Sequence, residues 1–190
     1  MKVLKDRIVA DGVAIGTEIV KVDSFLNHQI DVALLDEVGQ EFAKRFQGSE
    51  ITKILTVEAS GIAVACMAAR HMGNIPVVFA KKTSPSTMID GFYDAEVKSF
   101  TKGTTSLVRV SQKFINNGDK VLIIDDFLAH GEAALGLIEI VGLAGAELVG
   151  IGAVIEKQFQ GGGKRLKEKG YRVESLAVIQ SILDGKINFL

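Results

Sequence analysis

The chain has 190 residues, of which 47% are hydrophobic and 24% are charged. This size and balance predict one folded domain, residues 1–190, and argue against a disordered chain. The formal net charge of −1 argues against a nucleic-acid partner, because there is no basic excess to neutralise phosphates.

The first half of the chain predicts alternating helices and strands after a short arm. Hydrophobic side chains recur at helical spacing between Ile30 and Phe46, whereas residues 51–57 and 75–82 are short apolar runs of the kind found in buried strands. In chain order we expect a short helix, an extended arm, a helix, a buried strand, a helix and a second buried strand, at residues 3–10, 12–29, 30–46, 51–57, 62–73 and 75–82.

The second half continues this alternation after an irregular region. Residues 83–95 are polar and predict a mobile loop that closes over a site, and residues 96–111 predict a β-hairpin around Lys102 and Gly103. Then follow a third buried strand, a loop, a helix, a fourth buried strand beside the third, a short charged helix after a glycine turn, and a strand-like end, at residues 121–125, 126–132, 133–145, 147–157, 161–170 and 171–190.

Helices that alternate with continuously apolar strands predict an α/β fold, with a mostly parallel twisted sheet covered by helices on both faces. In such sheets ligands bind beyond the carboxyl ends of the strands. The segments that follow the strands should therefore share one rim, and they are residues 58–61, 80–82, 125–133 and 156–159.

Two adjacent acids at the end of the third strand are the strongest chemical signal. Asp125 and Asp126 follow four apolar residues, and a loop with Gly131 then leads into a helix. A helix N-terminus presents backbone N–H groups that suit a phosphate, while the two carboxylates suit the 2′- and 3′-hydroxyls of a ribose. The alternative is an acidic turn that caps the helix beginning near Ala133.

This segment, VLIIDDFLAHGEA, resembles the signature of the type I phosphoribosyltransferases: four hydrophobic residues, two acids and a small loop around glycine. The chain is similar in register to the xanthine branch of bacterial purine salvage, most specifically in KVDSFLNHQID (residues 21–31). The resemblance implies the type I phosphoribosyltransferase fold, a small hood built from the N-terminal arm and the C-terminal segment, and a homodimer. We expect the hairpin 96–111 and the arm to form the dimer interface.

The resemblance also implies a reaction. The 5-phosphoribosyl group of phosphoribosyl pyrophosphate (PRPP) would pass to N9 of xanthine, giving xanthosine 5′-monophosphate and pyrophosphate. Mg²⁺ would enter with PRPP rather than on direct protein ligands, since it favours substrate phosphates and water over cages made of protein alone. The chain offers no Cys/His cluster for zinc.

Residue roles are carried over from the same resemblance. Asp125 and Asp126 would act as the catalytic pair that holds the ribose. The PRPP 5-phosphate would lie on Ala129, His130, Gly131, Glu132 and Ala133. The pyrophosphate would lie on Glu58, Ala59, Ser60 and Gly61, with Lys81 or Lys82 neutralising its charge. The purine would contact Val20, Asn27 and Lys157, with the lysine on its 6-oxo group.

The residues themselves leave plainer interpretations open. Ser60 and Gly61 also fit an ordinary strand–helix turn in which Ser60 is the N-cap, and Lys81 and Lys82 fit a solvated pair. Asn27 fits a turn residue, and Phe159 fits either a ring stacked on the purine or a core side chain. We expect His130 to point to solvent and Glu132 to turn outward, away from the phosphate.

Particular sequence features disfavour three alternative functions. Ala129 stands where hypoxanthine-guanine enzymes carry an Asp, which favours xanthine; transfer to guanine or hypoxanthine is the alternative. A PRPP-sensing purine regulator is disfavoured by the short, neutral segment before the expected core. A dinucleotide-binding protein is disfavoured because no G-x-G-x-x-G follows the first strand.

Sequence features also bear on where the protein works. Residues 1–12 lack the hydrophobic region of a signal peptide, and no apolar stretch approaches the roughly 20 residues that span a bilayer. With a single cysteine, Cys66, no internal disulfide can form. We therefore expect a protein of the reducing cytoplasm with no membrane partner, in which Cys66 is a small core residue.

Overall fold

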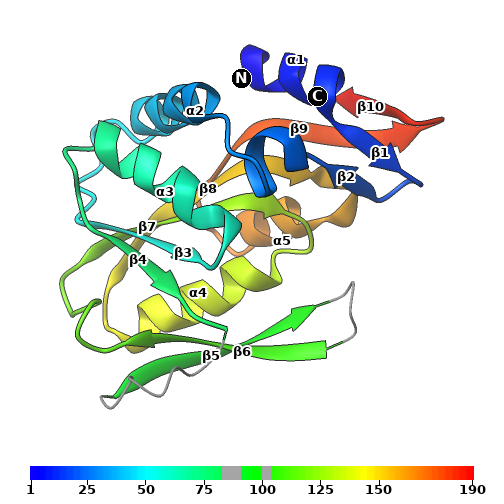
Figure 1. Cartoon of the computed structure of the whole chain (residues 1–190). Coiled ribbons are helices and arrows are strands. Elements are labelled where there is room, and N and C mark those ends of the chain that lie inside the picture. Colours follow the sequence, from blue (N-terminus) through cyan, green and yellow to red (C-terminus); the bar gives the residue numbers. More distant parts are fainter. Residues whose placement is uncertain (83–90, 100–103) are drawn as a thin grey trace.

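A computed structural model describes residues 1–82, 91–99 and 104–190 of the chain. Its centre is a six-stranded sheet in the order β10-β9-β8-β7-β3-β4 (Figure 1). The strands β4, β3, β7, β8 and β9 are parallel, and β10 runs antiparallel to β9. Their bounds are β3 Lys53–Val57, β4 Val77–Ala80, β7 Lys120–Leu128, β8 Glu147–Lys157, β9 Val173–Leu183 and β10 Lys186–Phe189. The predicted α/β fold with a mostly parallel sheet is confirmed.

Helices cover both faces of this sheet, as the alternation predicts. Helices α2 (Val32–Arg45) and α3 (Ser60–His71) lie on one face, and α4 (Glu132–Leu143) and α5 (Gly162–Glu168) lie on the other (Figure 1). Side chains of β7 alternate between the two cores: Leu122 and Ile124 pack with α2 and α3, whereas Val121 and Ile123 pack with α4. All four side chains are buried, two on each face of the sheet, which is why the sequence of this strand is a continuous apolar run.

The N-terminal arm and the C-terminal strands form the expected hood at one end of the sheet (Figure 1). Helix α1 (Lys2–Asp11) lies against β9, where the Met1 ammonium donates a hydrogen bond of 2.5 Å to the Leu176 carbonyl oxygen. The expected extended arm is more structured than predicted. It contains a small antiparallel hairpin and one π-helical turn, β1 (Val13–Ile15), β2 (Ile19–Lys21) and Asp23–Asn27.

A second hairpin, β5 (Phe92–Ser99) with β6 (Thr104–Ser111), confirms the predicted antiparallel pair. It packs on α4, where a methyl group at Gly136 would lie 2.6 Å from the Val97 side chain. The expected loop 83–95 falls mostly on residues 83–90, which lie outside the described residues. Its last part is wrong, because residues 92–95 belong to β5.

Three other details differ from expectation. Strand β7 continues past Asp125 to Leu128, because Phe127 and Leu128 pair with β8. Strand β4 is an edge strand rather than a buried one, and Phe79 is 38% exposed. Cys66 is exposed, because the buried positions of α3 fall on either side of it at helical spacing. Within residues 1–82, 91–99 and 104–190, no helix is long and apolar enough to cross a bilayer.

Candidate active site

A cavity of about 370 Å³ lies at the carboxyl ends of β3 and β7, between α4 and the hairpin β5–β6. It is lined by residues that were predicted to share one rim. They include Lys82, Asp125, Ala129, His130, Gly131, Glu132 and Ala133. The position agrees with the rule that ligands of parallel sheets bind beyond the strand ends.

The loop Ala129–Gly131 joins β7 to α4 and forms the floor of this cavity. Gly131 is the N-cap of α4 and has a φ of +84°, a conformation that side chains disfavour. No side chain of the described residues caps the first turn. Its backbone N–H groups are therefore available to an anion, and the helix dipole adds to their attraction.

The glycine-rich start of α5 packs against this loop. A methyl group at Gly162 would lie 2.3 Å from the Ala129 carbonyl oxygen and 2.6 Å from the Gly131 nitrogen. The Gly162 N–H donates a hydrogen bond of 3.0 Å to the same carbonyl. A side chain at this position would push the two segments apart. The sequence predicts only a turn at residues 161–163, although successive glycines also allow two backbone segments to pack closely.

Two side chains of the loop region also contact this second segment. His130 Nδ1 lies 3.1 Å from the carbonyl oxygen of Gln160, so the expectation that His130 points to solvent is wrong. Glu132 lines the cavity and pairs with Arg165, so the expectation that it turns outward is also wrong. Both contacts hold the N-terminus of α4 to the residues around α5, and the Arg165 guanidinium offsets the charge of Glu132 near an anion site.

The paired acids lie beside the loop at the end of β7. Both are partly buried, and Asp125 Oδ1 accepts a hydrogen bond of 3.0 Å from the Asp126 backbone nitrogen. Burial raises the pKa of the Asp125 carboxyl well above its ordinary value, and the neighbouring charge of Asp126 raises it further. A hydroxyl-rich ligand that donates hydrogen bonds to both carboxylates would reverse this cost.

The segment Glu58–Gly61 connects β3 to α3 on the same rim. The Glu58–Ala59 peptide bond is cis, and Ala59 rather than Ser60 is the N-cap of α3. The plain interpretation of Ser60 as a capping residue is therefore wrong, since Ser60 is the first helical residue. The first turn of α3 again lacks a side-chain cap among the described residues, which leaves a second set of amides for an anion.

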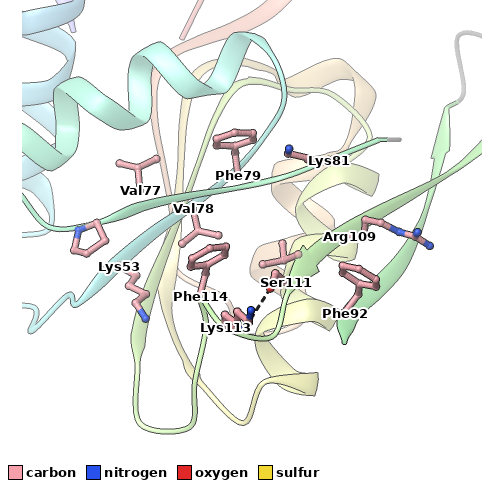
Figure 2. Close-up of a pocket in the computed structure, with 12 residues that line it drawn as sticks. Lys53, Val77, Val78, Phe79, Lys81, Phe92, Arg109, Ser111, Lys113 and Phe114 are labelled. Carbon is pink, nitrogen blue, oxygen red and sulfur yellow. Dashed lines mark hydrogen bonds between the residues drawn. The ribbon is translucent and has the colours of Figure 1, made fainter. Parts of the chain in front are cut away.

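The two lysines after β4 point to different places. Lys82 lines the cavity with Asp125, and its charge opposes the rise in the pKa of that acid. Its backbone nitrogen donates a hydrogen bond of 2.7 Å to Glu58 Oε1. Lys81 instead lies 5.8 Å from the centre of the Phe79 ring and lines a pocket of about 680 Å³ on the outer edge of the sheet (Figure 2).

The residues expected to hold a base come from the hood and from β8. The Lys157 ammonium lies 5.4 Å from the centre of the Phe127 ring and donates a hydrogen bond of 3.0 Å to the Glu18 carbonyl oxygen. Burial lowers the pKa of Lys157, and the nearby Glu18 opposes this shift. Val20 is buried on β2, and Asn27 is exposed at the end of the π-helical turn.

Phe159 lies just beyond Lys157, in the short 3-10 helix Gln158–Gln160. Its side chain is 38% exposed, so the interpretation of Phe159 as a core residue is wrong.

Paired acids near two helix N-termini that no side chain of the described residues caps have the chemistry that suits a sugar with phosphate groups at two positions. Residues 22–182 match the family model described as the phosphoribosyl transferase domain. The chain therefore belongs to the phosphoribosyltransferase family.

Individual relatives show which members of this family the chain is similar to. The chain is 58% identical over 189 residues to the xanthine phosphoribosyltransferase of Clostridium novyi, covering all of this chain and 99% of that protein. It is 53% identical to the xanthine phosphoribosyltransferase of Acinetobacter baumannii, again covering all of this chain and 99% of the relative. Among solved structures, the adenine phosphoribosyltransferase of Rhodothermus marinus is 28% identical with a TM-score of 0.68, over 77% of this chain and 80% of that one.

Proposed function

We propose that this protein transfers the 5-phosphoribosyl group of PRPP to N9 of xanthine, giving xanthosine 5′-monophosphate and pyrophosphate in purine salvage. The observation that carries the PRPP part is the juxtaposition at the end of β7. There, two carboxylates adjoin a loop whose backbone amides head an uncapped helix. The full-length identity of 58% to a xanthine phosphoribosyltransferase supports the choice of base.

The sugar phosphate would bind along β7 and the loop that follows it. The amides of residues 129–133 would hold the 5-phosphate, because α4 begins within this segment and no side chain of the described residues caps its first turn. Asp125 and Asp126 would accept hydrogen bonds from the ribose 2′- and 3′-hydroxyls. This contact favours the ionised form of Asp125 and so opposes the effect of burial, which raises the pKa of this carboxyl.

The leaving pyrophosphate would lie at the start of α3. The backbone of residues 58–61 would supply N–H groups, as at α4, and Lys82 would supply the positive charge, because its side chain lines the cavity with Asp125. We therefore assign this role to Lys82 in place of Lys81. Mg²⁺ would enter with PRPP, because it favours substrate phosphates and water as ligands, and Asp125, which lines the cavity, is an oxygen donor of the kind that it accepts. When bound, Mg²⁺ supplies charge neutralisation for the departing pyrophosphate.

The base would bind between the hood and the end of β8. The Lys157 ammonium would donate to the purine 6-oxo group, Asn27 would hydrogen-bond the ring edge, and Val20 would contact its apolar face. The protein supplies no nucleophile in this scheme. It accelerates the reaction by holding N9 against ribose C1 and by stabilising charge as the C1–oxygen bond breaks.

A comparison of purines tests the choice of base. Turnover of xanthine, guanine and hypoxanthine with PRPP and Mg²⁺ is measured separately, and we expect the highest kcat/KM with xanthine. A preference for guanine or hypoxanthine would move the protein to the alternative 6-oxopurine branch. Binding of PRPP without turnover of any purine would instead favour a PRPP-sensing regulator.

We further propose that the protein works in the reducing cytoplasm as a single domain that forms a homodimer. The open edge of the sheet supports the dimer, because Phe114 (57% exposed) and Phe79 (38% exposed) line one pocket there, on opposite sides of β4 (Figure 2). Exposed aromatic rings that gather at an open sheet edge are typical of interfaces. The same pocket includes Arg109, Val110 and Ser111, at the end of the hairpin 96–111 that we expect to take part in the interface.

A further inference from the structure

Glu156, next to the base-binding lysine on β8, is a buried carboxylate with no role in the scheme above. Its side chain is 4% exposed. The Ser175 hydroxyl on β9 donates a hydrogen bond of 2.5 Å to Oε2. A buried carboxylate is costly unless its surroundings use it.

The backbone of α5 closes directly onto this carboxylate. A methyl group at Gly163 would lie 2.1 Å from Glu156 Oε1, and the three nearest heavy atoms to it all belong to Glu156. Gly163 is itself buried. The carboxylate therefore sets how closely the start of α5 can approach β8 and β9.

Gly162, the residue before Gly163, contacts the loop Ala129–Gly131. A methyl group at Gly162 would lie 2.3 Å from the Ala129 carbonyl oxygen and 2.7 Å from the His130 carbonyl carbon. The Gly162 N–H also donates to Ala129 at 3.0 Å. One chain of contacts thus runs from Glu156 through two glycines to the loop that would hold the 5-phosphate.

We propose that Glu156 is a positioning residue for the PRPP 5-phosphate: it fixes the backbone of Gly162 and Gly163 beneath the loop Ala129–Gly131. This inference rests on the proposed function, because it deepens the role of that loop. Glu156 acts on PRPP rather than on the base, since its contacts lead to the loop. The ammonium of the adjacent Lys157 leads away to the Glu18 carbonyl.

Three variants test this chain of contacts: Glu156→Ala, Gly163→Ala and the double variant. Glu156→Ala leaves a space under α5, and Gly163→Ala forces α5 outward. We expect each single variant to raise the KM for PRPP about 10-fold, because small displacements of a binding loop are costly. The KM for xanthine and kcat should change by less than about 2-fold.

The double variant separates positioning from a general loss of structure. Its new methyl group at residue 163 enters the space that the carboxylate leaves, so we expect a KM for PRPP within about 3-fold of the wild type. Glu156→Gln keeps the shape and the hydrogen bond to Ser175, and should behave similarly. If Glu156→Ala does not fold, the comparison of Gly163→Ala with the double variant carries the test alone.

The matched control is Glu168→Gln, which changes an exposed carboxylate on α5 whose partner is Lys164 at 3.8 Å. It should leave both KM values unchanged. The proposal is overturned if the single effects multiply in the double variant, or if the KM for xanthine rises as much as that for PRPP. Titration of PRPP and Mg²⁺ by calorimetry without a purine gives the same comparison, so it tests Glu156 even if xanthine proves not to be the substrate.

Discussion

The Lys157 ammonium donates a hydrogen bond of 3.0 Å to the backbone carbonyl oxygen of Glu18, between the end of β8 and the turn of the N-terminal hairpin β1–β2. The side chain that we expect to contact the purine is thus hydrogen-bonded to the hood. A base with a 6-oxo group would take over this donor. The hood and the sheet therefore meet at the side chain that we propose binds the 6-oxo group of the base.

Replacing Lys157 should affect the base more than PRPP. We expect Lys157→Ala to raise the KM for xanthine about 10-fold or more, because a hydrogen bond from a charged donor is lost. The Kd of PRPP, measured by calorimetry, should change by less than about 2-fold. Lys164→Ala is the control, since Lys164 is an exposed lysine on α5. An equal loss of PRPP affinity in Lys157→Ala would contradict the assigned role.

The raised pKa of Asp125 predicts that this acid lowers the stability of the protein at neutral pH, although activity needs it. Because folding raises this pKa, the folded protein binds more protons than the unfolded chain between the ordinary and the raised value. Stability is then lost as the pH rises through that window. Asp125→Asn should therefore raise the melting temperature at pH 7.5, and the gain should vanish as the pH falls towards about 4.

The same Asp125→Asn variant should lose activity with every purine alike, because the ribose is common to all reactions. We expect kcat/KM to fall about 10-fold or more, since a charged hydrogen-bond acceptor is lost. Melting curves and initial rates on one protein preparation check both effects. A variant that is less stable than the wild type at pH 7.5, or that loses activity with one purine only, would be evidence against this role.

Gly61 should be intolerant of a side chain. A methyl group there would lie 2.1 Å from Thr56 Oγ1 and 3.3 Å from Asp125 Oδ1. Gly61→Ala would therefore displace the segment Glu58–Gly61, and we expect kcat/KM for PRPP to fall about 10-fold or more. Gly142→Ala on α4 is the matched control, because nothing lies within 4 Å of its added methyl group. Similar kinetics for the two variants would show that the contact at Gly61 is unimportant.

Ala129 offers a test of purine preference. An acid at this position is placed to accept a purine proton in the hypoxanthine-guanine branch, and xanthine is more acidic and needs less help. Ala129→Asp should raise the turnover of hypoxanthine or guanine relative to xanthine, by about 10-fold if the group acts as a general base. The ratio of rates in parallel assays is the readout. An unchanged ratio would remove this explanation.

The oligomeric state can be tested at the aromatic face. We expect light scattering to give the mass of a dimer for the wild type and of a monomer for Phe114→Glu, because a charge would be buried in the interface. Val9→Glu, at a residue 66% exposed on α1, is the control and should remain dimeric. A monomeric wild type at micromolar concentration would contradict the proposal.

Periodicity and motif spacing were enough for the sheet and for the main loop, because both depend on local patterns. The apolar run before Asp125 predicts a strand buried on both faces, and Gly131 predicts the turn into α4. What could not be predicted depends on contacts distant in sequence. Strand β7 extends to Leu128 because it pairs with β8. Cys66 is exposed because the buried residues of α3 lie at other positions of the helix.

Side-chain directions at the site were harder to predict for the same reason. The orientation of His130 is fixed by Gln160, and that of Glu132 by Arg165, on a segment about thirty residues away. The separation of Lys82 from its neighbour Lys81 follows from strand alternation at the sheet edge. The packing of Gly162 against the loop Ala129–Gly131 could not be predicted, because it depends on which two backbone segments meet in the fold.

Identification of the products tests the central claim most directly. The wild-type protein is incubated with PRPP, Mg²⁺ and xanthine, and the nucleotide and pyrophosphate are quantified together. The account predicts xanthosine 5′-monophosphate and pyrophosphate in equal amounts, with neither formed when xanthine or PRPP is omitted. Absence of both products from folded protein that is given every component would contradict it.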